Sequence, residues 1–194
     1  MIDLYNFFAS LSEKLASDDI IVTSAGSSFN AGTQGIKIKR GMRYIVPGGL
    51  APMGWSLPAS IGISLASNRR VICLDGEGGF QFNIQELQSV VHYKLPIKIF
   101  VLNNGGYLTV RQTQQRYFNQ CIGESPSTGV SFPNTEKIAN AYGIKFLKVE
   151  KEMFLDLILN NVLNCNAPII CEVMMPPDQK VLVPLKITPL KSGK

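Results

Sequence analysis

The chain has 194 residues, of which 45% are hydrophobic, and a formal net charge of +5 at pH 7. This length suits one α/β domain with a buried sheet and is too short for two full-sized domains. No run of about 18 or more apolar residues is present, and acidic residues interrupt the N-terminal amphipathic pattern, unlike in a signal peptide. We therefore expect a soluble, cytoplasmic protein without a membrane partner.

The distribution of the basic residues argues against a nucleic-acid-binding protein, and the spacing of the cysteines argues against a cysteine-ligated metal site. Lysine and arginine are dispersed apart from residues 36–43 and the C-terminal end, and no aromatic residues alternate with that stretch as a base-stacking surface requires. A solvated surface or an acidic partner chain explains such charge, so we expect no nucleic-acid partner. The four cysteines lack paired metal-ligand spacing, and we expect reduced thiols.

The first half of the chain predicts helices and strands in alternation. Apolar residues recur at helical spacing over 4–15, and 18–26 reads as a short β-branched strand that runs into a loop. Residues 48–67 predict a glycine-rich entry to a buried helix of small residues. A strand at 69–76, a helix at 82–95 capped by Asn83 and a strand at 97–104 then complete one parallel βαβ unit.

The second half continues the alternation after an irregular region. Residues 105–118 predict a helix, and 121–134, rich in Gly, Ser and Pro, predict a long surface loop. Helix, strand, helix and strand are then expected at 135–143, 144–150, 151–164 and 168–175. The pattern indicates a doubly wound, mainly parallel α/β sheet with helices on both faces. We assign residues 1–176 to this domain and 177–194 to a C-terminal tail.

Two polar turns follow neighbouring strands, where ligands bind in such sheets. Glu77 lies in the first, GEGG, and Asn104 in the second, NNGG, 27 positions later (104 − 77) with one helix between them. Carboxylate and amide oxygens suit Mg²⁺, and glycine amides can approach a phosphate. Each turn alone is commonly structural, no P-loop is present, and Asp75 is a rival metal ligand.

The two turns together resemble the diphosphate-binding motif of thiamine diphosphate-dependent enzymes, in which Gly-Asp-Gly is followed further along by Asn-Asn. GEGGF at 76–80 and LNNGGY at 102–107 match its two halves. GGLAPMGWSLPASIG at 48–62 resembles a segment of the acetolactate synthase-like group of that family. The resemblance covers most of the chain and implies the C-terminal, diphosphate-binding domain of such an enzyme.

The resemblance implies which residues hold thiamine diphosphate and Mg²⁺. Met53 would support the bent cofactor, and the carbonyl of Ala51 would accept from its aminopyrimidine amine. The implied metal ligands are Glu77, Asn104 and the carbonyl of Gly106. The other implied cofactor-binding residues are Ser27, Ser28, Gly49, Gly78, Gly79, Gly105 and Tyr107.

Two positions depart from the family pattern. Glu77 stands where aspartate is usual, and its extra methylene is expected to weaken Mg²⁺ binding; Asp75 lies two residues earlier, outside the glycine bracket. Thr113 stands where acetolactate synthases carry a tryptophan that shapes the acceptor pocket. This second departure argues against acetolactate synthase in the strict sense.

The resemblance also implies that the site is incomplete, because the activating glutamate belongs to a pyrimidine-binding domain or subunit. We expect no catalytic residue in this chain: Glu124 and other glutamates read as surface charges, and His92 as a surface residue. A homo- or hetero-oligomer acting on a small 2-oxo acid, as a decarboxylase (lyase) or carboligase (transferase), is the expected enzyme. The small-residue helix and the 125–134 loop are candidate interface and lid.

Two other interpretations remain open at this point. The first is a non-catalytic scaffold or regulatory subunit that keeps the fold, for which the glutamate at position 77 is the main argument. The second is an unrelated nucleotide-binding α/β domain in which GEGG cradles a phosphate. Magnesium-dependent binding of thiamine diphosphate separates the first, and preference over ADP or NAD separates the second.

Overall fold

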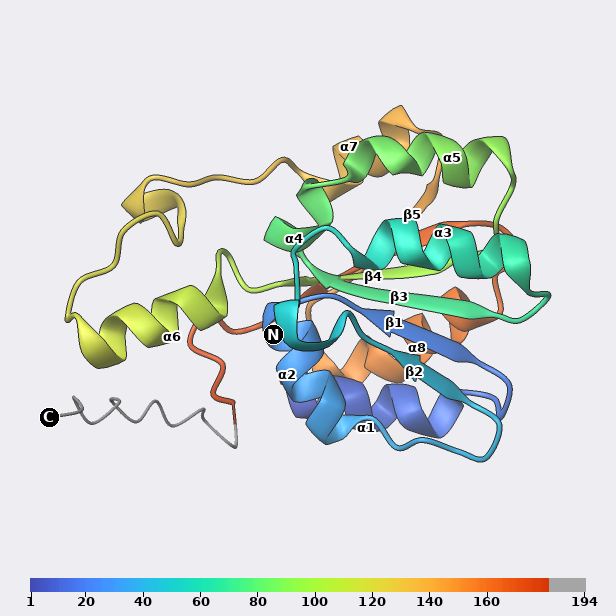
Figure 1. The fold of residues 1–194 in the computed structure, drawn as a ribbon, viewed down its shortest axis with the longest axis horizontal. Coiled ribbons are helices and arrows are strands. Elements are labelled where there is room, and N and C mark those ends of the chain that lie inside the picture. Colours follow the sequence, from blue (N-terminus) through green and yellow to red (C-terminus); the bar gives the residue numbers. More distant parts are fainter. Residues whose placement is uncertain (182–194) are drawn as a thin grey trace, which may run out of the picture.

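A six-stranded sheet, covered by helices on both faces, forms the body of the computed structural model, which describes residues 1–181 (Figure 1). The strand order is β2-β1-β3-β4-β6-β5, and every neighbouring pair is parallel. The expected doubly wound α/β fold is thereby confirmed. The strands are β1 (Ile20–Thr23), β2 (Arg43–Ile45), β3 (Val71–Gly76), β4 (Lys98–Asn103), β5 (Lys145–Val149) and β6 (Ile169–Met174).

Alternating side chains of the strands feed two apolar cores, one on each face of the sheet. Ile72 and Leu74 of β3 join the core beneath α1 (Leu4–Lys14) and α8 (Leu155–Leu163). Val71 and Cys73 join the opposite core. That core also contains residues of α3 (Ser56–Ala66), α5 (Leu87–His92) and α7 (Thr135–Ala141).

Helix α2 (Gly26–Gly35) and strand β2 appear where the sequence pattern predicts neither. The expected loop after β1 is instead helix α2, whose buried residues are serines, alanine and glycine and so form no apolar stripe. A Cβ on Gly32 would lie 2.8 Å from the Tyr44 hydroxyl, which shows how closely this helix packs. The three-residue strand β2 adds an edge to the sheet.

The region around the predicted 82–95 helix differs in detail. It consists of a 3₁₀ turn, η2 (Ile84–Glu86), followed by α5, and Asn83 makes no capping hydrogen bond. Instead, the Asn83 amide donates to the Gly54 carbonyl at 2.8 Å. A short helix, α4 (Glu77–Gln81), precedes it. The prediction that α3 is buried is met in part: Ser56, Leu57, Ser60 and Ile61 are buried, whereas Gly62, Leu65 and Ala66 are exposed.

Beyond β4, helix α6 (Leu108–Tyr117) and the loop after it extend from one end of the body (Figure 1). The loop contains one 3₁₀ turn, η3 (Pro126–Thr128), and η4 (Glu152–Phe154) precedes α8. The expected tail is described only to residue 181, and Gln179 within it binds the body through the Leu4 amide at 3.0 Å. No helix within residues 1–181 is long and apolar enough to cross a membrane.

Candidate functional site

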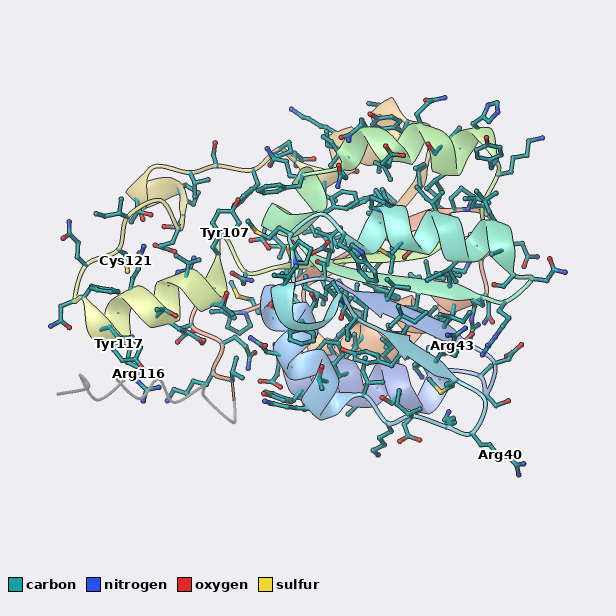
Figure 2. All side chains as sticks on the ribbon, in the orientation of Figure 1. Arg40, Arg43, Tyr107, Arg116, Tyr117 and Cys121 are labelled. Atoms are coloured by element: carbon teal, nitrogen blue, oxygen red, sulfur yellow. The ribbon has the colours of Figure 1, made fainter. Side chains whose placement is uncertain are left out.

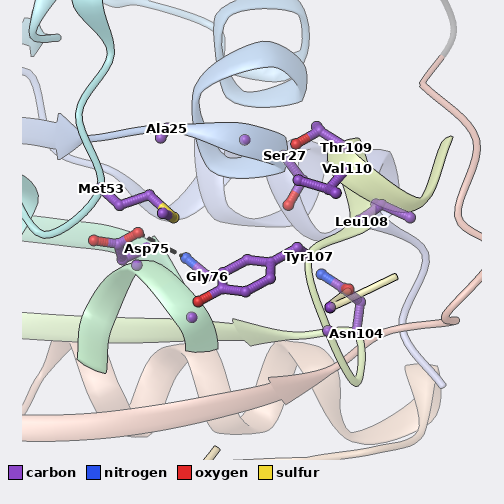
Figure 3. Close-up of a pocket in the computed structure, with 15 residues that line it drawn as sticks. Ala25, Ser27, Met53, Asp75, Gly76, Asn104, Tyr107, Leu108, Thr109 and Val110 are labelled. Carbon is purple, nitrogen blue, oxygen red and sulfur yellow. Dashed lines mark hydrogen bonds between the residues drawn. The ribbon is translucent and has the colours of Figure 1, made fainter. Parts of the chain in front are cut away.

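A cavity of about 350 Å³ opens at the carboxyl ends of the strands, between the starts of α2, α4 and α6 (Figure 3). The polar turns after β3 and β4 converge there, as expected for a parallel sheet. The sequence-predicted residues that line it are Ser27, Met53, Gly78, Gly79, Asn104, Gly106 and Tyr107.

Glu77 lies at the start of α4 with 5% of its surface exposed. Its Oε1 accepts the backbone N–H groups of Asn104 at 3.2 Å and Gly106 at 2.7 Å. Among residues 1–181, its buried Oε2 has no hydrogen-bond partner, and neither has the buried Oδ1 of Asn104. Buried oxygens are seldom left unpaired, and carboxylate and amide oxygens are the types of ligand that a hard cation binds.

Burial raises the pKa of Glu77 from 4.5 to about 7, against the backbone N–H groups around it, which lower it. In the ligand-free protein the unfolded carboxyl ionises near pH 4.5 and the folded one near pH 7. The contribution of the Glu77 carboxyl to the free energy of unfolding therefore falls as pH rises from about 4.5 to about 7. Above that range this contribution changes no further.

We predict that Glu77→Gln removes this pH dependence. The free energy of unfolding of the variant minus that of the wild type should increase by on the order of 3 kcal/mol from pH 4.5 to pH 7, measured by urea denaturation without magnesium. The cost of burying the glutamine Nε2 is independent of pH and cancels from this slope. If the difference in free energy of unfolding between variant and wild type did not change with pH, the raised pKa of Glu77 would be contradicted.

Asp75 also lines the cavity, but donors occupy both of its oxygens. Oδ1 accepts from the Ser24 hydroxyl at 2.7 Å and the Gly76 amide at 2.9 Å, and Oδ2 accepts from the Ser56 hydroxyl. Burial raises the pKa of Asp75 to about 6, while the Ser56, Ser24 and Gly76 hydrogen bonds lower it. Asp75 thus links Ser24, Ser56 and the Gly76 amide beside the cavity, and it offers fewer free lone pairs than Glu77.

Two glycines of the first turn, Gly78 and Gly79, have no room for a side chain. A Cβ on Gly78 would lie 2.2 Å from Cε1 of Tyr107, and one on Gly79 would lie 2.2 Å from Oδ1 of Asp75. The Tyr107 ring packs edge-on against the Phe132 ring, with 5.2 Å between the ring centroids. Glycine at both positions therefore keeps the backbone close to its neighbours.

Gly78→Ala should lower the free energy of unfolding by about 1–3 kcal/mol, because the tyrosine ring must move. In a Tyr107→Ala background the same change should cost less than about 1 kcal/mol. Gly62→Ala is the matched control, since nothing lies within 4 Å of a Cβ there. An equal cost of Gly78→Ala in both backgrounds would show that the ring is not the obstacle.

The second turn is held from the side by a buried ion pair. Nε of Arg111 donates to Oε2 of Glu124 at 2.6 Å, and its Nη2 donates to the Gly105 carbonyl at 3.2 Å. The Tyr107 amide donates to the Glu124 carbonyl at 2.7 Å. The expectation that Glu124 is a surface charge is wrong, because its side chain is buried. Its partner Arg111 lies in α6, and the position of that helix brings the two side chains together.

Five of the predicted residues are not part of the cavity lining: Ser28, Gly49, Ala51, Glu77 and Gly105. Ala51 adopts a left-handed backbone conformation (φ 38°), which costs a non-glycine residue about 1–2 kcal/mol and is characteristic of functional positions. Ser28 donates to the Ala25 carbonyl at 2.9 Å. His92 is exposed, as expected, with its ring against Tyr93.

Besides Gly76, which lies within the GEGG turn, six lining residues were missed by the sequence reasoning. They belong to the start of α2, the first turn of α6 and the loop after it, where no amphipathic pattern marks a boundary. Their one signal is the run of small residues after β1. They are Ala25, Gly26, Leu108, Thr109, Val110 and Gly123.

The candidate metal position offers one carboxylate oxygen, Oε2 of Glu77, and one side-chain amide oxygen, Oδ1 of Asn104. Within residues 1–181 no group of three or more His, Cys, Asp or Glu side chains is placed to hold a metal ion. The oxygen set at Glu77 and Asn104 therefore suits a hard cation that keeps water and phosphate ligands.

A family model described as "Thiamine pyrophosphate enzyme, C-terminal TPP binding domain" matches residues 24–173, which include every residue of both turns. The chain belongs to this family. Its acetolactate synthase-like character is also shown by the relatives it matches.

The acetolactate synthase large subunit of Porphyra purpurea is 36% identical over 163 residues, covering 82% of this chain and 27% of that protein. The isozyme 2 large subunit of Escherichia coli is 32% identical over 164 residues, covering 84% and 30%. A solved Rhodococcus jostii thiamine diphosphate-dependent 4-hydroxybenzoylformate decarboxylase superposes with a TM-score of 0.79 at 28% identity, covering 92% and 33%. The chain thus spans about a third or less of these relatives.

Proposed function

We propose that the chain binds thiamine diphosphate through Mg²⁺ and supplies the diphosphate-binding half of an active site. The enzyme would be an acetolactate synthase-like decarboxylase or carboligase of small 2-oxo acids. The observation that carries the proposal is the pair of buried, unpartnered oxygens, Glu77 Oε2 and Asn104 Oδ1, at the two turns of the motif. A cation there would satisfy both.

The proposed metal ligands are Glu77, Asn104 and the carbonyl of Gly106. The tight glycine turn at Gly78 and Gly79 leaves the backbone free to approach a diphosphate. Met53 lines the cavity with 42% of its surface exposed, as an apolar support for a cofactor ring would be. Secondary roles are proposed for Ser27, Ser28, Gly49, Ala51, Gly105 and Tyr107.

Bound thiamine diphosphate would supply the electron sink for cleavage of the bond next to a 2-oxo acid carbonyl. The residues of this chain would hold and orient the diphosphate end. Among residues 1–181, Asp75 is the one carboxylate that lines the cavity, and donors occupy its oxygens. We therefore assign the activating glutamate to a pyrimidine-binding domain or subunit, in a homo- or hetero-oligomer.

The scaffold alternative is disfavoured by the same pair of oxygens. A chain that binds no cation would keep two buried acceptors unsatisfied at a cost of about 1–3 kcal/mol each. Glu77 reaches the second turn despite departing from the usual aspartate, because its Oε1 contacts two backbone N–H groups there. The longer side chain is thus accommodated by the turn.

Calorimetric titration of thiamine diphosphate with and without Mg²⁺, beside ADP and NAD, tests the proposal. We expect magnesium-dependent heat with thiamine diphosphate and none with the other two. Equal binding of ADP or NAD would favour the nucleotide-binding alternative. No magnesium-dependent binding, even with a pyrimidine-binding subunit added, would favour the scaffold.

A further inference from the structure

Another buried carboxylate, Glu172, lies at the same edge of the sheet as the metal position. It stands on β6 with 7% of its surface exposed, on the face covered by α7. Its Oε1 accepts the Asn103 side-chain amide at 2.8 Å and the Thr135 hydroxyl at 2.6 Å. Glu172, Asn103 and Thr135 form a hydrogen-bonded cluster, and the proposed function assigns it no role.

The position of the cluster follows from the strand register. β4 and β6 pair Val101 with Glu172 and Asn103 with Met174, so Asn103 and Glu172 are diagonal neighbours on one face of the sheet. Thr135 opens α7, after the long loop. The three side chains therefore tie the end of β4 to β6 and to α7.

The orientation of the Asn103 amide is fixed from two sides. Its Oδ1 accepts the backbone N–H of Gly105 at 3.0 Å, and that group can only donate. Its Nδ2 faces Oε1 of Glu172, which accepts. Turning the amide over would set two acceptors together on one side and two donors on the other.

The bond from Gly105 to Asn103 closes a tight turn around Asn104. Gly105 has φ +72° and Gly106 φ +156°, so side-chain sterics do little to fix this backbone. The same turn delivers the amides of Asn104 and Gly106 to Glu77 Oε1. Asn103 thus restrains the segment that carries two of the three proposed magnesium ligands.

We propose that Asn103 is a positioning residue for the metal, with its amide oriented by Glu172 and Thr135 so that the turn holds Asn104 and Gly106 toward Glu77. The inference rests on the proposed function, which assigns those three residues to Mg²⁺. Loss of a group that hydrogen-bonds to metal ligands and orients them commonly lowers metal affinity about 10–100-fold.

A charge-swap pair of variants tests the inference. Asn103→Asp places a second carboxylate against Glu172, and we expect magnesium-dependent affinity for thiamine diphosphate to fall about 10-fold or more. Glu172→Gln alone keeps Oε1 as the acceptor of both hydrogen bonds and should stay within about threefold of wild type. The double variant restores a donor facing the aspartate and should recover most of the loss.

Two further readouts separate positioning from general stability. Amide hydrogen exchange at Gly105, measured by NMR without metal or cofactor, should speed up in Asn103→Asp and slow again in the double variant. Thermal unfolding identifies a temperature at which all variants are folded, and affinities are compared there. Wild-type affinity and exchange in Asn103→Asp, or a double variant no better than the single one, would overturn the inference.

The exchange measurement also keeps this inference distinct from the proposed function. It reports on the turn in the protein alone and decides whether Asn103 restrains it. Failure of the wild type to bind thiamine diphosphate with magnesium, in the presence of the pyrimidine-binding subunit, would instead overturn the proposed function and the metal role built on it.

Discussion

Glu77→Ala should abolish magnesium-dependent binding of thiamine diphosphate, with a loss of affinity of about 100-fold or more. The variant removes both the free Oε2 and the Oε1 that gathers the Asn104 and Gly106 amides. Since outer-shell changes alone cost 10–100-fold, removal of a direct ligand should cost at least the upper end of that range. Calorimetric titration of both proteins at the same Mg²⁺ concentration measures the difference.

Glu13→Ala is the matched control for this loss. Glu13 is an exposed glutamate of α1 whose carboxylate pairs with Lys37 at 3.0 Å. It is absent from the cavity lining, so its removal should leave the affinity within about twofold of wild type. Wild-type affinity in folded Glu77→Ala would place the metal elsewhere.

The second large effect is expected for stability, at Arg111. Its guanidinium pairs with buried Glu124 and donates to the Gly105 and Pro177 carbonyls. Arg111 therefore joins the second turn, the long loop after α6 and the segment after β6. Arg111→Ala would leave the Glu124 charge buried without this partner. We expect the free energy of unfolding to fall by about 3–5 kcal/mol, measured by urea denaturation.

An exposed arginine and a paired change provide the controls. Arg40 lies on a loop at the opposite end of the body from α6 (Figure 2), and Arg40→Ala should change stability by less than about 0.5 kcal/mol. Arg111→Met combined with Glu124→Gln removes both charges and should cost less than Arg111→Ala alone. A loss below about 1 kcal/mol for Arg111→Ala would mean that the pair does not hold these segments together.

The fold was predictable wherever side-chain periodicity reports burial. The strands β3 and β4 are nearly continuous apolar runs, and α8 has a clear apolar face, so their places follow from sequence. Helix α2 was not predictable in this way, because its buried residues are small and polar. The three-residue β2 is half exposed and too short to show alternation.

The candidate site was predictable to the level of its two turns, and its supporting contacts were not. Convergence of Glu77 and Asn104 follows from parallel strands ending at one edge. The Arg111–Glu124 and Asn103–Glu172 contacts depend on how α6 and β6 are placed in space, which no local pattern encodes. The same holds for the absence of a donor to Oε2 of Glu77 in the described part of the chain, which makes the carboxylate a candidate ligand.

The most direct test of the magnesium assignment is a crystal structure with thiamine diphosphate and Mn²⁺, in which anomalous scattering locates the ion. The pyrimidine-binding subunit should be included where it is needed for binding. We expect one ion about 2.0–2.3 Å from a Glu77 carboxylate oxygen, Oδ1 of Asn104 and the carbonyl of Gly106, with diphosphate oxygens completing the shell. An ion bound to Asp75 instead, or a diphosphate away from the Glu77 and Asn104 turns, would contradict it.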